Sequence, residues 1–330
     1  MKGKYIFYYD SGTSNTRLYV LDHNLEVLHV NKKNVGSKDS AIAGNNRVLI
    51  QGMKELYDEA IKEMQFSKED IASIYASGMV TSPYGLKEVP HLELPLTAQE
   101  FANSVVPFFE DTCFNEEILL IPGLKTVNKD FSYVNNMRGE EIEIFGTLDE
   151  LKSLNKSNIA LFFPGSHTHI TYIQDDKITD IISNFTGELF YALKTATILS
   201  PILKADLNEL DEAMVRKGVE NLIRFGFNRA IYICHAMRIF NEGTEKERFS
   251  YAEGVVNGGI RQSLEYYCKH FWKECQTAAV VGDEFMYRLF SIIFEGSEYI
   301  KEIIWLPISD KKSYAVEGLK KIISLRRESL

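Results

Sequence analysis

Residues 5–22, YIFYYDSGTSNTRLYVLD, hold the pattern that decides the fold. Two runs rich in β-branched and aromatic residues flank the polar turn Asp10–Asn15, which is typical of a β-hairpin. Gly12 is expected to supply a backbone conformation that other residues resist. The hydroxyl and N–H groups of the turn suit a phosphate, and the Asp10 carboxylate suits Mg²⁺, although an ordinary polar hairpin turn explains the same residues.

The same pattern returns at residues 158–182, NIALFFPGSHTHITYIQDDKITDII. An apolar strand again runs into a turn of small residues, and two further strands separated by a tight turn follow it. This repetition indicates a duplicated βββ unit. Its layout resembles the actin-like, sugar-kinase superfamily of ATPases. We therefore expect an α/β, duplicated ribonuclease-H-like (actin-like ATPase) fold with mixed sheets, domains at 1–150 and 151–330, and an interdomain cleft where the two turns grip a polyphosphate.

The composition indicates a soluble protein of enzyme size. The 330 residues are 45% hydrophobic and 25% charged, which is enough for two domains with cores of their own. The net charge of −9 argues against nucleic acid or an anionic membrane as the main partner. We expect no signal peptide, and no apolar run approaches the roughly 20 residues that span a bilayer. The four cysteines lack metal-ligand spacing, so we expect free thiols and a cytoplasmic location.

Periodicity predicts the elements between these hairpins. Apolar residues at helical spacing predict a helix within residues 46–64, whereas residues 31–46 are expected to form a surface connection or an irregular strand. A strand ends in the loop 77–82, where ligand contacts collect in α/β folds, although a plain Gly/Ser turn explains this loop as well. Gly254 and Gly258 are spaced for close helix packing. The basic tail, residues 318–330, is expected to be an amphipathic, solvated terminal helix.

The most unusual segment is NNMRGEEIEIFGTLDEL, residues 135–151. Arg138, Gly139 and the pair Glu140–Glu141 stand at the start of a predicted amphipathic helix. Two glutamates in a first helical turn complement the helix dipole, which is their commonest role. The same residues would also suit an acidic polyol, with Arg138 binding its carboxylate and a glutamate binding its hydroxyls.

Two short motifs in the second half have alternative interpretations. His167 and His169 place two rings on one face of a strand, but no third metal ligand is evident nearby, so phosphate contact or packing is favoured over a metal site. Gly282 and Asp283 lie between a predicted strand and helix. They fit a tight turn with a capping Asp as well as the close approach of an adenosine.

Six motifs in order resemble the 2-keto-3-deoxygalactonokinase family, from the N-terminus to about Gly282. They are Asp10–Arg17, Ser77–Ser82 with Glu88–Pro90, Pro122–Leu124, Met137–Glu141, Pro164–His167 and Thr186–Leu189. The resemblance implies a kinase that uses ATP and Mg²⁺ to phosphorylate the terminal hydroxyl of 2-dehydro-3-deoxy-galactonate, in galactonate catabolism.

On this basis we assign roles to individual residues. Asp10 is the metal ligand and Glu140 the base that accepts the hydroxyl proton, with Asp10 as its rival for that role. Arg138 binds the substrate carboxylate, and Gly78, Met79 and Glu141 also contact the substrate. The resemblance implies that Gly282 and Asp283 bind the adenosine of ATP. The residues assigned to the phosphates of ATP are Gly12, Thr13, Ser14, Asn15, Arg17, Gly165, Ser166, His167 and Thr168.

Three alternatives stay open. A kinase for another sugar or sugar acid fits the departures from the family, since Ser11 stands where Trp is usual and His169 where Lys is usual. A catalytically weak, sugar-sensing protein of the same fold would be expected to carry a DNA-binding segment, and none is seen. A filament-forming relative is disfavoured by the sugar-acid motifs. We expect ATP and a sugar acid as partners, without nucleic acid or membrane, and leave a homodimer open.

Overall fold

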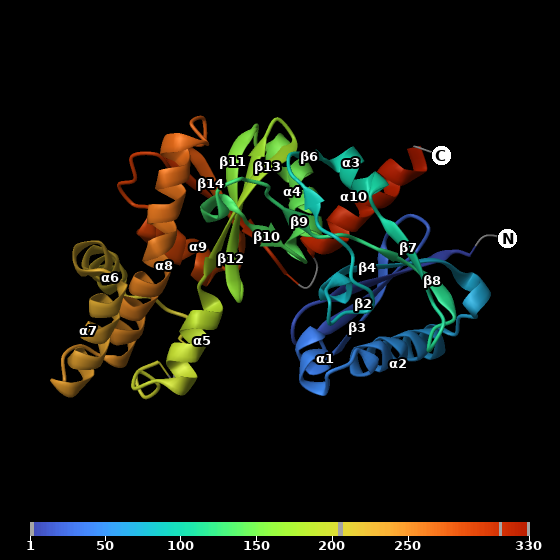
Figure 1. The fold of residues 1–330 in the computed structure, drawn as a ribbon, viewed down its shortest axis with the longest axis horizontal. Coiled ribbons are helices and arrows are strands. Elements are labelled where there is room, and N and C mark those ends of the chain that lie inside the picture. Colours follow the sequence, from blue (N-terminus) through green and yellow to red (C-terminus); the bar gives the residue numbers. More distant parts are fainter. Residues whose placement is uncertain (1–2, 204–206, 310–311, 329–330) are drawn as a thin grey trace. The chain divides into compact units, whose positions relative to one another are not determined.

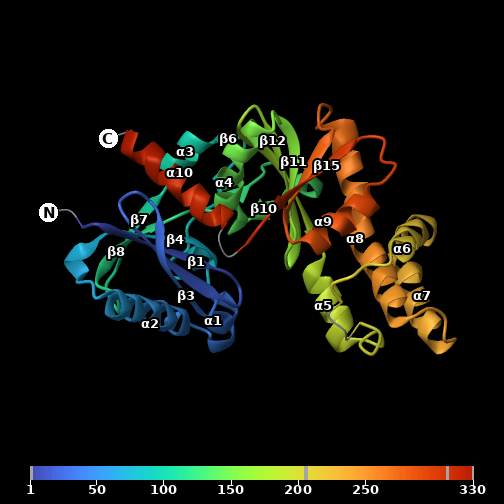
Figure 2. The ribbon, with the colours of Figure 1, turned by 180° about the vertical axis from the view of Figure 1, so that it is seen from behind.

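The computed structural model describes residues 3–203, 207–309 and 312–328 (Figures 1 and 2). The chain divides into two units, the first formed by Met1–Glu150 with Ser313–Leu330 and the second by Leu151–Lys312. The expected second domain, 151–330, therefore differs at its end, because the last helix packs within the first unit.

The first unit contains a six-stranded sheet in the order β3-β2-β1-β4-β8-β7. Strands β1, β2 and β3 are antiparallel neighbours, and β4 and β8 continue the sheet parallel to β1. A small second sheet has the order β10-β9-β5. The strands of this unit are β1 Tyr5–Ser11, β2 Thr16–Leu21, β3 Val27–Lys33, β4 Ile71–Gly78, β5 Leu92–Glu93, β6 Leu96–Thr97, β7 Val106–Glu110, β8 Glu116–Leu120, β9 Leu124–Lys125 and β10 Asn136–Met137.

The strands of the second unit repeat this scheme in the order β15-β14-β11-β12-β13. Strands β11, β12 and β13 are antiparallel neighbours, and β14 and β15 run parallel to β11. The duplicated βββ unit predicted from the two hairpins is thus confirmed. The strands are β11 Asn158–Phe163, β12 His167–Gln174, β13 Lys177–Phe185, β14 Thr277–Gly282 and β15 Glu302–Pro307.

The helices connect these strands. They are α1 Ser37–Ala43, α2 Arg47–Met64, α3 Ala98–Asn103, α4 Glu140–Ser153, α5 Gly187–Ala196, α6 Glu212–Phe225, α7 Phe227–Ile239, α8 Glu245–His270, α9 Glu284–Ile293 and α10 Tyr314–Glu328. Single 3₁₀ turns lie at Lys68–Asp70, Met79–Thr81 and Phe131–Tyr133. The helix predicted within residues 46–64 is confirmed as α2, whereas residues 31–46, expected to be a surface connection or an irregular strand, contain the end of β3 and the short helix α1. Among the described helices, none has both the length and the apolar character required to cross a bilayer.

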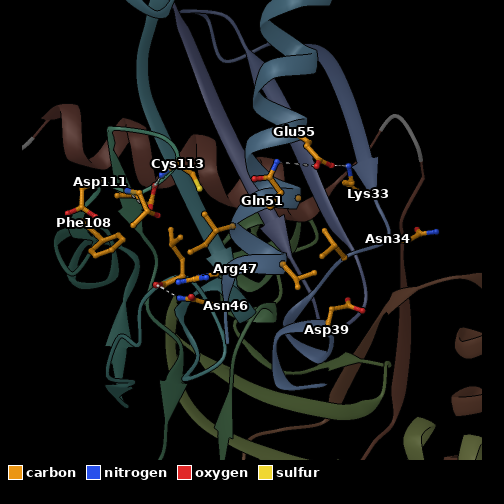
Figure 3. Close-up of a pocket in the computed structure, with 17 residues that line it drawn as sticks. Lys33, Asn34, Asp39, Asn46, Arg47, Gln51, Glu55, Phe108, Asp111 and Cys113 are labelled. Carbon is orange, nitrogen blue, oxygen red and sulfur yellow. Dashed lines mark hydrogen bonds and ion pairs between the residues drawn. The ribbon is translucent and has the colours of Figure 1, made fainter. Parts of the chain in front are cut away.

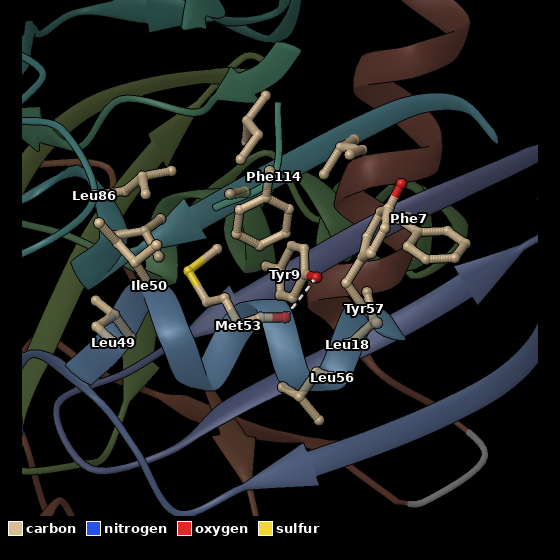
Figure 4. Close-up of a cluster of buried hydrophobic side chains, with 14 of the residues drawn as sticks. Phe7, Tyr9, Leu18, Leu49, Ile50, Met53, Leu56, Tyr57, Leu86 and Phe114 are labelled. Carbon is tan, nitrogen blue, oxygen red and sulfur yellow. Dashed lines mark hydrogen bonds between the residues drawn. The ribbon is translucent and has the colours of Figure 1, made fainter. Parts of the chain in front are cut away.

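The core of the first unit lies between its large sheet and α2 (Figure 4). Alternate strand residues such as Tyr9 and Leu18 are buried against Met53 of α2, and the Tyr9 hydroxyl donates to the Met53 carbonyl at 2.9 Å. Because side chains alternate along a strand, Tyr8 and Asp10 point to the opposite face of the sheet. Helices α4 and α10 cover that face (Figures 1 and 2). The alternation therefore directs Asp10 towards α4.

Two glycines allow α10 and α4 to touch along their backbones. A Cβ atom at Gly146 would lie 2.0 Å from the Tyr314 carbonyl oxygen, and one at Gly318 would lie 1.8 Å from the Ile142 carbonyl oxygen. The apolar face of α10, including Leu319, is buried. The predicted amphipathic helix is therefore confirmed, and the expectation of a mainly solvated tail is corrected, because the apolar face of α10 packs within the first unit.

Replacing Gly318 with alanine is expected to lower the free energy of unfolding by about 1–3 kcal/mol, the usual cost of overpacking. The added methyl group has no room, since the neighbouring atom is backbone. Urea unfolding measures the change. Gly259→Ala is the matched control, because a Cβ atom there meets nothing within 4 Å, and its stability should stay level or rise by up to about 1 kcal/mol. Equal stability of the two variants would contradict the close α4–α10 contact.

The second unit carries a helical layer formed by α6, α7 and α8. Helices α6 and α8 approach closely because a Cβ atom at Gly254 would lie 2.2 Å from the Val215 carbonyl oxygen, and one at Gly258 would lie 3.0 Å from Leu222. The prediction that Gly254 and Gly258 serve close helix packing is confirmed.

Candidate active site

Three segments far apart in sequence meet at one edge of the first unit. Gly78, at the end of β4, has a φ of +82°, and a Cβ atom there would lie 2.3 Å from the Ser11 carbonyl oxygen at the end of β1. The same atom would lie 3.7 Å from Cα of Gly139, whose own φ is +122°. Only glycine adopts both conformations without strain. These two glycines therefore bring Asp10, at the end of β1, towards Glu140, at the start of α4.

Glu140 and Glu141 are carboxyl groups without full hydrogen bonding. Among the described residues, Oε2 of Glu140 and Oε1 of Glu141 are buried and have no hydrogen-bond partner, while Oε2 of Glu141 accepts from the Gly139 N–H. Burial raises the pKa of Glu140 to about 7, and burial together with the charge of Glu140 raises the pKa of Glu141 to about 8. Both carboxyl groups therefore change charge near neutral pH.

Glu143 is a member of this cluster that our sequence reasoning missed. It is partly buried, and burial together with the negative charges of Asp10 and Glu140 raises its pKa well above the usual range. A usable signal was present, because residues three apart on a helix lie on the same face, which places Glu143 beneath Glu140.

Asp10 is paired with Arg17 across the hairpin. The Arg17 Nη1 atom lies 3.5 Å from Oδ2 of Asp10, and the Asp10 side chain is 24% exposed. Burial raises the pKa of Asp10, and the guanidinium of Arg17 opposes this shift. The structure thus brings together Asp10, Arg17 and Glu140 from the predicted site, with one Asp10 face open to solvent.

The turn after Asp10 is shaped by a glycine other than the predicted one. Gly12 does not adopt a left-handed conformation, and its Cβ atom would have ordinary room, 3.6 Å from the Asn15 carbonyl oxygen, so the expectation for Gly12 is wrong. Gly36 is the constrained residue, since a Cβ atom there would lie 2.3 Å from the Thr13 carbonyl oxygen. Thr13 and Ser14 are exposed at the tip of the turn, where their hydroxyl groups can reach a ligand.

Arg138 is anchored by the loop that follows β4. Its guanidinium donates to the Thr81 hydroxyl and, at 2.9 Å, to the Val89 carbonyl, and it lies 3.2 Å from the ring of His91. Burial and the charge of Arg138 lower the pKa of His91 to about 4, so this ring is neutral. These contacts use part of the five N–H groups of the guanidinium, and the remainder have no hydrogen-bond partner among the described residues, although the negative charges of Glu141 and Glu88 attract the guanidinium. Met79, in the same loop, is partly exposed.

The corresponding turn of the second unit lies against the start of α5. The Glu188 N–H donates to the Ser166 carbonyl at 2.7 Å, and Gly165, Ser166 and His167 are exposed. His167 Nε2 lies 3.2 Å from Oε2 of Glu188. Thr168 is different, because it is buried. Its hydroxyl is hydrogen bonded to Thr186 and supports the turn from inside, and the phosphate role of Thr168 stays a prediction.

His169 is also buried, and its Nδ1 lies 3.0 Å from the Ser183 hydroxyl. Burial lowers the pKa of His169 to about 4. Within residues 3–203, 207–309 and 312–328, no group of three or more His, Cys, Asp or Glu side chains is placed to hold a metal ion.

Gly282 and Asp283 form the junction between β14 and α9. The Asp283 side chain accepts the Met286 N–H at 2.9 Å and so caps α9, as the turn interpretation predicted. A Cβ atom at Gly282 would meet no atom within 4 Å, which leaves open space above the junction.

A separate hollow of about 1040 Å³ in the first unit lies at the start of α2 (Figure 3). Its lining comes from the end of β3, the first half of α2 and the β7–β8 connection, and includes Asn46, Arg47 and the ion pair between Lys33 and Glu55. None of the residues assigned to ATP or the sugar acid lines this hollow. The residues predicted to bind ATP and the sugar acid therefore lie outside this hollow.

Solved structures share the fold. The crystal structure of a Sinorhizobium meliloti protein assigned as a 2-dehydro-3-deoxygalactonokinase is similar with a TM-score of 0.76 and 19% identity, covering 98% of this chain and 99% of that one. An acetate kinase of Porphyromonas gingivalis has a TM-score of 0.50 and 9% identity, covering 98% of this chain and 100% of that one. At these identities the likeness shows the fold alone. The predicted duplicated, actin-like α/β fold is confirmed.

Sequence comparison is more specific. A Rhizobium meliloti (strain 1021) protein named "Probable 2-dehydro-3-deoxygalactonokinase DgoK1" is 26% identical over 191 residues, which are 58% of this chain and 56% of that protein. The alignment thus spans little more than half the length of this relative. The family model described as 2-keto-3-deoxy-galactonokinase matches residues 10–319. Because this match covers most of the chain and includes every motif on which the resemblance was based, the chain belongs to the 2-keto-3-deoxy-galactonokinase family.

Proposed function

We propose that the protein is an ATP-dependent kinase that phosphorylates the terminal hydroxyl of 2-dehydro-3-deoxy-galactonate. The observation that carries this proposal is the meeting of β1, β4 and α4, where the glycine contact brings the Asp10 end of β1 to the Glu140 end of α4. Family membership supplies the reaction class. A loose phosphoryl-transfer transition state requires positioning and charge neutralisation more than covalent chemistry. The meeting of the three segments supplies the positioning, and Arg17 with Mg²⁺ held by Asp10 would supply the positive charge.

Glu140 is the proposed base for the acceptor hydroxyl. A general base works best when its pKa is close to the operating pH, and burial raises the pKa of Glu140 to about 7. Its Oε2 atom has no hydrogen-bond partner among the described residues, so it can take a proton without breaking an existing bond.

Asp10 is the proposed Mg²⁺ ligand. Mg²⁺ is commonly held by one or two carboxylates and completed by phosphate and water, so a single partly exposed carboxylate fits this donor set. Bound there, Mg²⁺ would neutralise charge that develops on the phosphates. Arg17, 3.5 Å from Asp10, would add positive charge on the same side.

The exposed residues of the two turns are the proposed phosphate-binding residues, and Arg138 is the main proposed contact of the sugar acid. Thr13 and Ser14, with Gly12 and Asn15, would bind phosphate in the first unit, and Gly165, Ser166 and His167 in the second. The free N–H groups of Arg138 would bind the carboxylate of the sugar acid, since a half-buried guanidinium favours an anion over a neutral sugar. Gly78, Met79 and Glu141 stay proposed as further substrate contacts.

A coupled assay of ADP release over a panel of 2-keto-3-deoxy sugar acids, aldonic acids and neutral sugars tests the proposal. The 2-dehydro-3-deoxy-galactonate should give the highest kcat/KM. A higher kcat/KM for a different acid would support the kinase activity and assign it a different substrate. If none of these compounds leads to ADP release, the proposed function is contradicted.

Replacing Arg138 with methionine is expected to weaken use of the acid by about 2–5 kcal/mol in kcat/KM, the range for a lost buried charge pair. Affinity for ATP, measured without the acid, should hardly change. Thr81→Val is the matched control, because it removes one loop contact of Arg138 and keeps the guanidinium. An equal loss in Thr81→Val would mean that Arg138 only holds the loop, and a loss of ATP affinity would place Arg138 on the phosphates.

A further inference from the structure

Trp305, on β15, is a large aromatic side chain that is fixed in place but left uncovered. Its indole N–H donates to the Gly282 carbonyl oxygen at 2.9 Å, and its ring stacks on Tyr287 of α9, with centroids 5.6 Å apart and planes 10° apart. Even so, 36% of the residue is exposed. Three elements thus orient the ring, and part of its surface remains free.

The other tryptophan of the chain shows what a structural role looks like. Trp272 is 2% exposed, lies between the rings of Tyr172 and Tyr267, and donates its N–H to Asp180 at 2.9 Å. All of its surface is used inside the protein. Trp305 has the same kind of polar anchor without this enclosure.

The place of Trp305 in the sheet is one where ligands bind. Strands β14 and β15 are parallel, with Val280 opposite Trp305 and Gly282 opposite Pro307, so the indole lies near the carboxyl ends of both strands. In open α/β sheets, ligands collect at this edge. The space above Gly282 is open, since a Cβ atom there would meet no other atom within 4 Å. Figure 2 labels β15, which carries Trp305, and α9, which follows Gly282 and Asp283. A flat ligand can therefore lie against the junction and reach the indole.

We propose that the indole of Trp305 stacks against the purine base of the nucleotide. The inference rests on the proposed kinase function and adds a base-recognising residue to it. An aromatic platform binds a base through its π-face, and the hydrogen bond to Gly282 together with Tyr287 holds the platform rigid, so little side-chain entropy is lost on binding.

Tryptophan fluorescence tests the contact without any variant. ATP added in the absence of a sugar acid should quench the emission, whereas inorganic tripolyphosphate, which has no base, should not. Trp305→Phe should abolish the quenching, since Trp272 is then the remaining tryptophan, and Trp272→Phe should retain it. Free N-acetyltryptophanamide titrated with ATP corrects for absorbed light. ATP binding seen by calorimetry without quenching, or quenching that survives in Trp305→Phe, would overturn the proposal.

Kinetics separate this role from a structural one. Trp305→Leu should raise the KM for ATP roughly 5- to 150-fold, the range for one lost stacking contact, with kcat and the KM for the acid nearly unchanged. Trp305→Phe, which keeps a ring, should fall in between. An equal rise in both KM values, or none in a folded Trp305→Leu, would overturn the proposal while the kinase function stands. If the native protein phosphorylates no sugar acid, the function fails, and quenching by ATP still decides the inference.

Discussion

Glu140→Gln is expected to lower kcat by about two to four orders of magnitude, the usual contribution of a general base. Glutamine keeps the size of the side chain and cannot take a proton. In the native enzyme, the rate should rise with pH and level off above about pH 7, because the base works only when deprotonated and burial places its pKa there. The variant should show no such rise. Steady-state kinetics from pH 5.5 to 9 measure both effects.

Thermal unfolding is the control for this variant. A carboxyl group whose pKa is raised by folding loses stabilisation as the pH rises from the unfolded value towards the folded one. Glu140→Gln should therefore be as stable as the native protein near pH 4.5 and more stable above pH 7. If Glu140→Gln is stable and its activity is close to that of the native protein, Asp10 and not Glu140 is the base.

Asp10→Ala is expected to remove nearly all phosphoryl transfer while the fold remains intact. The change removes the proposed metal ligand and leaves Arg17 without its partner at the hairpin. Because the charge of Asp10 raises the pKa of Glu140, any residual activity should have its pH midpoint shifted to lower pH. The Mg²⁺ dependence of the rate, followed together with the pH profile, measures both effects.

Asp58→Ala is the matched control for this variant. Asp58 is an exposed carboxylate on α2 that pairs with Lys54, and surface pairs of this kind contribute little. Its turnover should stay native. Native turnover in Asp10→Ala would remove Asp10 from the metal site.

Much of the architecture could be predicted because it depends on local periodicity. Alternating residues around Asp10 and again in 158–182 predict the two hairpins, and their repetition predicts the same strand order in both units. The 3.6-residue spacing predicts α2 and α4 in the same way. Nothing distant in the chain is needed for these inferences.

What could not be predicted depends on contacts between distant residues. Gly12 is in the motif, yet Gly36 is the residue that packing constrains, because the crowding comes from a carbonyl group more than 20 positions away. Arg138 appears free in the sequence and is held by Thr81 and Val89 in the structure. Glu143 acquires its raised pKa from burial and from Asp10, which lies on another element. Such effects exist only once the sheet and α4 have come together.

The return of α10 to the first unit has a consequence for synthesis on the ribosome. The first unit is discontinuous, and the whole of Leu151–Lys312 is translated before α10 becomes available. Strands β1–β4 can pair early, but the face of the sheet that carries Asp10 stays uncovered by α10 during that interval. A premature stop codon after the second unit would therefore leave the second unit whole and damage the first unit, although the first unit is encoded largely at the other end of the chain.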